Sequence, residues 1–379
     1  MANKTARLGD LATYINGYAF KPADWGETGL PIIRIQDLTG NSYQLNRYDG
    51  EYPERIEVND GDVLISWSAS LGVYVWQRGK ALLNQHIFRV VFDKLPVNKD
   101  YFVFAVEHKL AEMESKTHGA TMKHIVKKDF DGTTIPYPPI EKQAEIADHL
   151  RRITSLIDRQ TEQLLLLDQL VKSRFIELFG DPVTNPYGWQ QLTVNDVCVS
   201  IVRGPFGSAL KKEFFVPPSD TTYKVYEQKH AIQKSSTIGT YYVTAEKYNE
   251  LRRFECHSGD ILMSCSGTMG ELYQLPAGCE RGIINQALCK FTLNERILPI
   301  AFLAYMRETI GNLETKGSGI QNIAAVSYVK AMPINLPPMR VQEQFAAFVE
   351  QTDKSKLAVQ KGLQELEILK KSLMQQYFG

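Results

Sequence analysis

Two stretches of the chain place apolar residues at alternating steps of four and three, the pattern of a long amphipathic helix. They cover 138–180 and 337–379, and each opens on a Pro-Pro pair. The apolar positions are Ile146, Leu150, Ile153, Ile157, Leu164, Leu167, Val171 and Leu178 in the first stretch, and Phe345, Val349, Val359, Leu363, Leu366, Leu373 and Tyr377 in the second. A period near 3.5 residues predicts a coiled coil, and each helix would span about 57 Å at 1.5 Å per residue. We expect the two helices to pack antiparallel on each other; the alternative is that each lies along a globular core.

The segments between these helices have a different pattern. Residues 1–137 and 181–336 mix short β-rich runs, punctuated by Gly, Pro and Asn, with shorter helical stretches. Examples of the runs are 31–35, 62–66 and 87–92. We therefore predict an α/β protein of four parts: a globular domain at 1–137, a helix at 138–180, a globular domain at 181–336 and a helix at 337–379.

A longer pattern indicates that the chain is a duplication. Gly61-Asp-Val-Leu-Ile-Ser66 returns as Gly259-Asp-Ile-Leu-Met-Ser264, at an offset of 259 − 61 = 198, and Pro138-Pro139 returns as Pro337-Pro338, at an offset of 199. Several landmarks in one order at a near-constant offset predict two related domains with approximate twofold symmetry. Between the landmarks the copies diverge, which favours two sites of one kind that read different things.

Composition narrows the function classes. Apolar residues make up 44% of the 379 residues, enough for two cores, and 43 Lys+Arg balance 43 Asp+Glu. Zero net charge counts mildly against a freestanding DNA binder, which needs positive charge for phosphates, although a basic face or a partner could supply it. The five cysteines form no CxxC pair, so we expect reduced thiols and no zinc site. Without a signal-peptide pattern or a long apolar run, the chain is expected to be soluble and cytoplasmic.

The motifs of common catalysts are missing from the sequence. It contains no phosphate-binding GxxxxGK[ST] loop, no GxGxxG loop, no HExxH pair and no GxSxG elbow around Ser66 or Ser264. Residues 185–188, Asn-Pro-Tyr-Gly, lack the second proline of a methyltransferase motif and are interpreted as a linker. We assign the recurring acids Asp62 and Asp260 to Gly-Asp turns that open strands. A non-catalytic binding protein is thus favoured over an enzyme.

These features together resemble the DNA-specificity subunits of type I restriction-modification enzymes. The resemblance covers essentially the whole chain, and it rests on Leu8-Gly-Asp-Leu11, the repeated Gly-Asp-(Val/Ile)-Leu, 317–323 and the two Pro-Pro-led helices. It implies two target-recognition domains that each read half of a bipartite DNA site, with the helices fixing the gap between halves. It also implies two docked modification subunits that carry S-adenosylmethionine, and restriction subunits that cleave unmodified DNA. The chain itself would hold no cofactor and no metal.

Candidate DNA contacts are polar residues near flexible backbone, where they could enter a groove. The Gly-rich stretch 317–323 contributes Ser318, Gln321 and Asn322, and its first-copy counterpart, 119–125, contributes Thr121, Lys123 and His124. For phosphates we select Lys21, aligned with Lys211 at an offset of 190, together with Lys212 and Ser208. On one face of a predicted strand we select Arg34 and Gln36, aligned with Tyr226 and Gln228 at an offset of 192.

Two other functions remain open at this stage. The chain could be a coiled-coil scaffold that joins proteins without touching DNA, which zero net charge suits well. It could also be a metal-dependent nuclease, which would need clustered carboxylates. Asn84-Gln85 and Asn285-Gln286 recur unchanged, so we predict that they serve the scaffold and not specificity.

Overall fold

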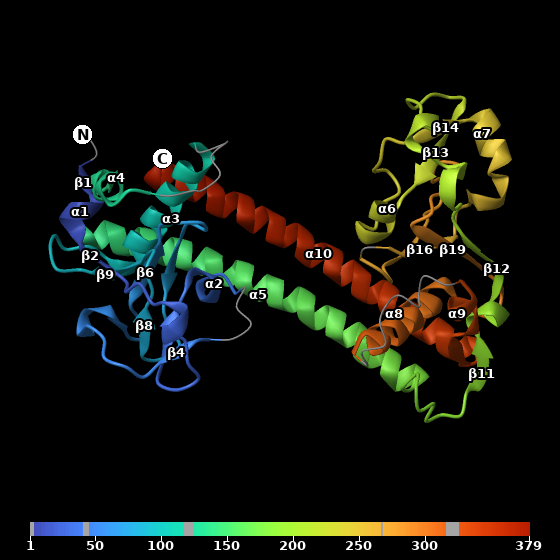
Figure 1. The fold of residues 1–379 in the computed structure, drawn as a ribbon, viewed down its shortest axis with the longest axis horizontal. Helices are drawn as coiled ribbons and strands as arrows, with labels where there is room; N and C mark the ends of the chain where they lie inside the picture. Colours follow the sequence, from blue (N-terminus) through green and yellow to red (C-terminus); the bar gives the residue numbers. More distant parts are fainter. Residues whose placement is uncertain (1–3, 41–44, 117–124, 267, 316–325) are drawn as a thin grey trace. The chain divides into compact units, whose positions relative to one another are not determined.

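The computed structural model describes residues 4–40, 45–116, 125–266, 268–315 and 326–379 (Figure 1). It divides into two compact units, which we call unit 1 (1–162 with 359–379) and unit 2 (163–358). Each unit contains one α/β domain, part of helix α5 (Ile140–Phe179) and part of helix α10 (Met339–Phe378). The two long helices are therefore shared between the units.

Within its described residues, unit 1 contains two four-stranded sheets and a two-stranded one. The first sheet is antiparallel, in the order β2 (Thr13–Asn16), β9 (Ile87–Val91), β6 (Val63–Ser66), β7 (Gly72–Val75). The second has the order β4 (Arg47–Tyr48), β3 (Leu30–Ile33), β8 (Ala81–Leu83), β5 (Glu57–Val58), and its β3–β8 pair is parallel. The two-stranded sheet joins β1 (Thr5–Arg7) to β10 (Thr134–Pro136). The helices are α1 (Leu8–Leu11), α2 (Ile35–Leu38), α3 (Lys99–Lys116) and α4 (Lys127–Gly132), with 3-10 turns η1 (Pro22–Asp24) and η2 (Glu54–Ile56).

Unit 2 repeats this order strand for strand. Its antiparallel sheet is β12 (Cys198–Arg203), β19 (Leu288–Leu293), β16 (Ile261–Ser264), β17 (Leu272–Gln274). Its mixed sheet is β14 (Tyr242–Thr244), β13 (Thr222–Tyr226), β18 (Gly282–Ile284), β15 (Glu255–Cys256), with β13–β18 parallel. Strands β11 (Gln190–Thr193) and β20 (Pro333–Leu336) form the small sheet. The helices are α6 (Gln228–Ile232), α7 (Ala245–Glu250), α8 (Pro299–Thr315) and α9 (Val326–Ala331), and the 3-10 turns are η3 (Val194–Val197), η4 (Gly207–Ala209), η5 (Lys212–Phe214) and η6 (Arg252–Phe254). The predicted duplication is confirmed at the level of sheet order.

Each main core is completed by the start of one long helix and the end of the other. In unit 1, Ile146 and Leu150 of α5 and Phe378 of α10 are buried among the side chains of β2, β9 and α3. In unit 2, Phe345 of α10 and Phe179 of α5 are buried against β16, β19 and α8. The recurring Phe-Gly at the end of each helix thus anchors it in a core.

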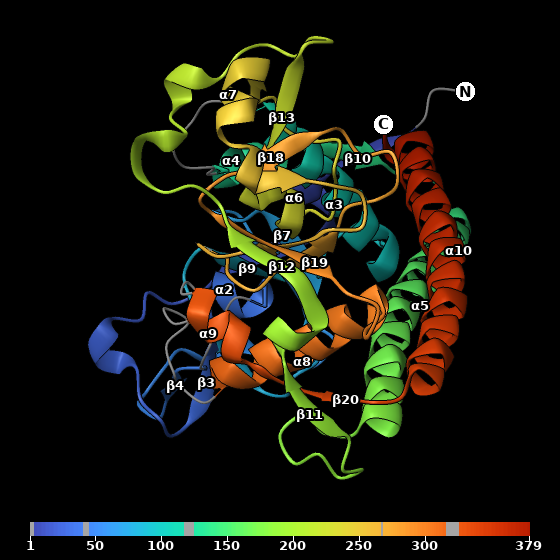
Figure 2. The ribbon, with the colours of Figure 1, turned by 90° about the vertical axis from the view of Figure 1, so that its right-hand side faces the viewer.

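The two long helices pack antiparallel within each unit, side by side in Figures 1 and 2. In unit 1, the Nδ1 atom of His149 lies 3.5 Å from the Tyr377 hydroxyl. In unit 2, the Lys356 ammonium lies 2.6 Å from Asp168, and the rings of Phe175 and Phe345 are 5.7 Å apart. Residue numbers fall in one helix as they rise in the other, and the predicted apolar positions are buried or half-buried. The coiled-coil prediction is confirmed.

A buried glutamine joins each long helix to its own α/β domain. The Oε1 of Gln143 accepts from the Asn98 N–H at 3.0 Å while its Nε2 donates to the Pro138 carbonyl at 2.9 Å. The Oε1 of Gln342 accepts from the Leu298 N–H at 2.9 Å, and its Nε2 donates to the Pro337 carbonyl at 3.0 Å. In each unit the glutamine amide bonds to a backbone N–H of the α/β domain and to the carbonyl of a proline that leads into the helix. We therefore call the recurring Pro-Pro-x-x-x-Gln pattern the glutamine clamp, and its role is structural.

The structure corrects the placement of Arg34 and Gln36. Strand β3 ends at Ile33, Arg34 caps α2, and Gln36 lies inside α2, so the two residues do not share a strand face. The alignment of these residues was also wrong by one position. Asn84 N–H donates to the Ile33 carbonyl, and the recurring Asn285 N–H donates to that of Tyr226, so Tyr226 matches Ile33.

Candidate nucleic-acid interface

The loop between β2 and β3 of unit 1 exposes a lysine and a tryptophan. Lys21 precedes turn η1, its backbone N–H donates to the Asp24 carboxylate at 2.7 Å, and the residue is exposed. Trp25 ends the same turn and is 43% exposed. An aromatic side chain beside a cation is a combination found at nucleic-acid surfaces, where it stacks and pairs with phosphate.

Arg34 connects this loop to helix α2. Its guanidinium lies 5.7 Å from the Trp25 ring, and its Nε donates to Asp37 at 3.2 Å. The buried Asp37 carboxylate also accepts the Arg34 backbone N–H at 2.8 Å. With its amide turned to satisfy its neighbours, Gln36 accepts from Arg34 Nη2 at 2.8 Å. Arg34 is therefore held in one orientation with its side chain 15% exposed, whereas Gln36 is exposed on the surface.

The corresponding loop of unit 2, between β12 and β13, is built in the same way. Lys211 precedes η5 as Lys21 precedes η1, and Phe214 N–H returns to the Lys211 carbonyl at 3.1 Å. Ser208, Lys211 and Lys212 are all exposed, and Lys211 lies 3.6 Å from Glu213. Arg203 lies 5.3 Å from the ring of Phe206, which is 67% exposed. The structure thus brings Ser208, Lys211 and Lys212 into one exposed loop segment.

Gln228 does not belong to that loop segment. Its Nε2 donates to the carbonyls of Ser266 and, at 3.3 Å, Thr268, and its Oε1 accepts from the Ser266 hydroxyl at 3.3 Å. This amide braces the Ser-rich turn after β16. Its engagement there argues for a positioning role in place of the base contact predicted from the sequence.

The remaining six candidates lie outside the described residues: Thr121, Lys123, His124, Ser318, Gln321 and Asn322. The described chain resumes at Ile125, whose N–H donates to the Trp67 carbonyl at 3.0 Å. Sequence reasoning also missed Trp25 and Phe206; the available signal was a large aromatic residue in a polar, Gly- and Pro-containing loop.

The recurring acids and serines brace the scaffold. Asp62 accepts the Asn59 N–H at 2.8 Å, and Asp260 accepts the His257 N–H at 2.8 Å, as the Gly-Asp turn interpretation requires. In both units a serine ends the following strand, Ser66 in unit 1 and Ser264 in unit 2. Its hydroxyl donates to the backbone carbonyl oxygen four residues further along the Ser-rich turn, at 2.6 Å in both units. These side chains are committed to local structure.

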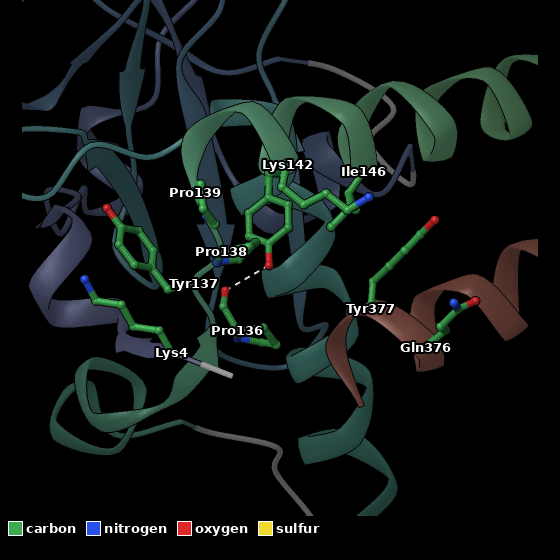
Figure 3. Close-up of a pocket in the computed structure, with 10 residues that line it drawn as sticks. Lys4, Pro136, Tyr137, Pro138, Pro139, Lys142, Ile146, Gln376 and Tyr377 are labelled. Carbon is green, nitrogen blue, oxygen red and sulfur yellow. Dashed lines mark hydrogen bonds between the residues drawn. The ribbon is translucent and has the colours of Figure 1, made fainter. Parts of the chain in front are cut away.

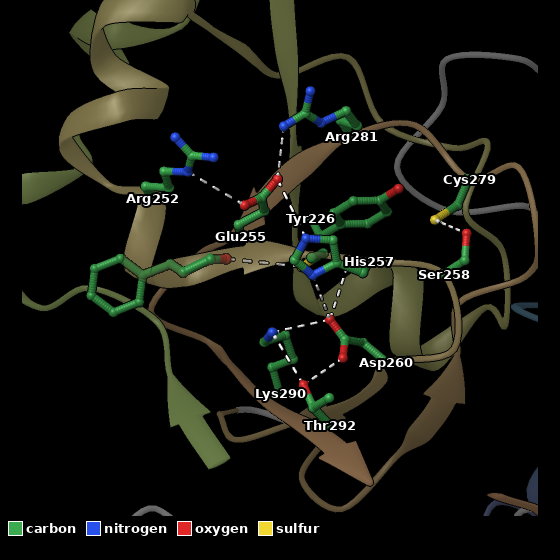
Figure 4. A network of polar contacts seen from close by, with 12 residues as sticks. Tyr226, Arg252, Glu255, His257, Ser258, Asp260, Cys279, Arg281, Lys290 and Thr292 are labelled. Atoms are coloured by element: carbon green, nitrogen blue, oxygen red, sulfur yellow. Dashed lines mark hydrogen bonds and ion pairs between the residues drawn. The ribbon is translucent and has the colours of Figure 1, made fainter. Parts of the chain in front are cut away.

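Figure 4 shows the polar network around Asp260. The buried Lys290 donates to Asp260 at 3.0 Å and Thr292 donates to it at 2.6 Å. Nearby, burial acts to raise the pKa of Glu255, but hydrogen bonds from Tyr248 and Arg281 outweigh it and hold that pKa below its usual value. Among the described residues no group of three or more His, Cys, Asp or Glu is arranged to hold a metal ion.

A histidine takes the place of Asp37 in the second copy. His230 is buried in α6, its Nδ1 accepts the Glu227 N–H at 2.9 Å, and its Nε2 donates to the Ile238 carbonyl at 2.7 Å. Nδ1 can accept this N–H only in the neutral ring, which then caps α6 as the carboxylate of Asp37 caps α2. Burial lowers the pKa of His230, and the positive charge of Lys224 lowers it further.

Acid is therefore expected to destabilise the chain through His230. Since the folded pKa lies below the unfolded value of 6.5, stability is fully present above about pH 6.5 and is lost as pH falls through the folded pKa. Urea unfolding between pH 8 and pH 5 should show a falling free energy of unfolding. The His230→Asn variant, which keeps an acceptor for the Glu227 N–H, should show a smaller fall; equal falls would contradict this account.

Comparison with known proteins decides the family. The model for the type I restriction modification DNA specificity domain matches residues 2–167 and again residues 186–368. The chain belongs to this family. Both copies of the duplicated unit are thus specificity domains, as their common strand order indicates. Specificity subunits of this family are generally non-catalytic.

Relatives and solved structures of the family agree with this assignment. The chain is 29% identical over 168 residues to the EcoBI specificity subunit of Escherichia coli (44% of this chain, 35% of that protein). It is 24% identical over 198 residues to the MjaVIII specificity subunit of Methanocaldococcus jannaschii (51% and 46%). These matches span about a third to a half of each relative.

Two solved structures share the fold along nearly the whole chain. The type I S subunit from M. genitalium has a TM-score of 0.53 at 13% identity, covering 99% of this chain and 96% of that one. A structure concerned with complex assembly and conformational transition of the type I restriction-modification system has a TM-score of 0.61 at 15% identity, covering 99% and 97%.

Among the described residues, no helix is long and apolar enough to cross a membrane.

Proposed function

We propose that this chain is the DNA-reading, non-catalytic subunit of a type I restriction-modification enzyme. Each α/β domain would read one half of a bipartite site, and the α5–α10 pair would set the gap between halves. Modification subunits that carry S-adenosylmethionine would dock on the helices and methylate adenines, which must leave the base stack to react. Restriction subunits would join to cleave unmodified DNA.

The observation that carries the proposal is a repeated scaffold with different residues on its exposed loops. The strand order, the glutamine clamp and the Gly-Asp turns recur in both units. The loops after β2 and β12 keep the lysine before a 3-10 turn, but one carries Trp25 and the other Phe206. Two α/β domains with the same scaffold and different exposed side chains are suited to two half-sites of different sequence.

We assign the exposed side chains to two roles. Lys21, Lys211, Lys212 and Ser208 would contact phosphates, which position the protein without reading sequence. Gln36, held beside the fixed Arg34, would contact a base edge, because an amide can pair bidentately with adenine. Thr121, Lys123, His124, Ser318, Gln321 and Asn322 stay base-reading candidates on the sequence pattern alone.

The test is a single-molecule methylome of cells that express the chain with its modification subunit. A split motif with a fixed gap should appear when the chain is present and vanish when it is deleted. If adenine methylation by an active modification subunit is independent of the chain, the proposal fails and a protein-joining scaffold replaces it.

The two roles predict different defects. The Lys211→Ala/Lys212→Ala double variant should weaken DNA binding by the assembled enzyme several-fold for every sequence and lower the salt dependence by up to about two charges. Gln36→Ala should instead relax one position of one half-site, at a cost of about 1–3 kcal/mol for the cognate base. Binding titrations at several salt concentrations, with Lys128→Ala on α4 as the control, measure both. A motif change in the lysine variant, or an unchanged motif in the glutamine variant, would contradict the assignment.

A further inference from the structure

Each unit has a pocket at the joint where its α/β domain enters a long helix. The unit 1 pocket, of about 570 Å³, is bounded by Tyr137 and the Pro138-Pro139 pair, by Lys4 beside β1, and by Tyr377 near the end of α10 (Figure 3). The Tyr137 hydroxyl donates to the Pro96 carbonyl at 2.6 Å, which fixes the ring. Prolines and aromatic rings thus form much of the pocket wall.

The unit 2 pocket, of about 470 Å³, lies at the equivalent joint. It is bounded by the Pro337-Pro338 pair, Leu336, Trp189 and Gln190. The strand registers pair Thr5 with Pro136 and Gln191 with Asn335, so Gln190 occupies the place of Lys4 and Leu336 that of Tyr137. Four positions therefore line both pockets, although the side chains at two of them differ.

The two pockets lie at equivalent positions in the two units, and the side chains that line them are chemically similar. Each has apolar walls and at least one cation, Lys4 and Lys142 in unit 1 and Arg296 in unit 2, and no carboxylate is among the described residues that line either one. Among the described residues, no ion pair joins Lys4 or Arg296 to an acid, whereas Lys142 of the first pocket is paired with Glu145 at 2.7 Å. Asp196 is the acid nearest in effect to Arg296: hydrogen bonds from Thr193 lower the pKa of its carboxyl, and the charge of Arg296 lowers it further. The pockets therefore suit a short segment with an apolar side chain and a carboxylate. A DNA backbone fits less well, because it has no apolar group to fill a proline-walled hollow.

We infer that each pocket receives an acidic, extended segment of one modification subunit, so that two equivalent pockets seat two equivalent partners. The inference rests on the proposed function, in which such subunits dock on the helices. It adds the place of docking, the joint between domain and helix, and the chemistry of the docking segment. A segment held there would touch the α/β domain and the long helix at once, because Lys4 and Lys142 line one pocket.

Charge reversal of Lys4 and of Arg296 tests the inference on the full chain. Binding of modification subunits is measured by native mass spectrometry and by titration. Lys4→Glu and Arg296→Glu should each weaken one of two binding events by about tenfold and shift the dominant complex from two subunits to one, and the double variant should lose both. Lys128→Glu in unit 1 and Arg253→Glu in unit 2, also exposed cations, serve as controls and should change nothing.

Lys4→Met and Arg296→Met repeat the test without adding a charge, and thermal unfolding shows whether each variant is folded. Folded variants that bind modification subunits as the unaltered chain does would overturn the inference. A loss of DNA affinity with unchanged subunit binding would also overturn it, and would make the pockets phosphate contacts. The proposed function fails separately, if the unaltered chain recruits no modification subunit and directs no methylation.

Discussion

Removing residues 158–164 from α5 together with 358–364 from α10 is expected to shorten the gap in the methylated DNA motif. The two segments face each other: in unit 1, a Cβ added at Gly362 would lie 3.0 Å from Nε2 of Gln160. Seven residues are two turns of a coiled coil, so the apolar seam stays continuous after the deletion. The pair becomes about 10 Å shorter at 1.5 Å per residue. At 3.4 Å per base pair, that length corresponds to about three base pairs.

The shorter gap also turns one half-site around the DNA axis. Three base pairs correspond to roughly 100° at 10 to 10.5 base pairs per turn. The new motif is therefore expected to be methylated more slowly than the original, because the DNA must twist or bend to present both halves. A methylome of cells carrying the deletion measures the gap. A motif that keeps its original gap would show that the helix pair does not set the spacing.

Removing only 158–164 is the matched control. It leaves α10 seven residues longer than α5, so the edge-to-face contact of Phe175 with Phe345 and the contact of His149 with Tyr377 can no longer form together. We expect this variant to lose methylation of both the original and the shortened motif. If it behaves as the paired deletion does, antiparallel packing is not what fixes the gap.

The long helices and the duplication were accessible from the sequence because both depend on periodic patterns. Apolar positions at a 3.5-residue period need only one partner of the same kind. Two polar residues, Lys356 and Thr352, interrupt the apolar series of α10, and each makes a local contact. Lys356 reaches Asp168, and Thr352 donates its hydroxyl proton to the Phe348 carbonyl at 2.9 Å. Gly-Asp turns were predictable for the same reason, since they are formed within a few residues of chain.

The surface chemistry was less accessible because it depends on contacts between distant residues. The run Pro31–Ile35 has strong β propensity, yet the chain turns into α2 after Ile33 because the buried Asp37 caps the helix through the Arg34 N–H. The alignment of Gln36 with Gln228 was wrong by one residue for a similar reason. The correct alignment of the two copies follows only from the hydrogen bond between Asn285 and Tyr226, which are far apart in the sequence. The cation–π contact of Arg34 with Trp25 and the pocket between Tyr137 and Tyr377 likewise require the folded chain.

The Gly17→Ala substitution is expected to destabilise unit 1 by about 3 kcal/mol or more, because the new methyl group has no space. A Cβ at Gly17 would lie 1.9 Å from the Asn84 carbonyl oxygen and 2.6 Å from that of Leu83. These are backbone atoms, held by the bond from Tyr18 N–H to the Leu83 carbonyl at 2.8 Å, so they cannot move aside as a flexible side chain could. The role predicted for the recurring Asn-Gln pair is therefore scaffolding, by close backbone packing.

Gly204→Ala should have the same effect in unit 2, where the added Cβ would lie 1.9 Å from the Asn285 carbonyl oxygen. Gly132→Ala is the matched control in unit 1, since a Cβ there would meet nothing within 4 Å. Urea unfolding gives the loss of stability. Because a bipartite site needs both readers, either damaging variant alone should abolish methylation of the whole motif. If Gly17→Ala is as stable as Gly132→Ala, then the strand crossing at Asn84 is looser than this packing implies, and the recurrence of Asn84-Gln85 must have another cause.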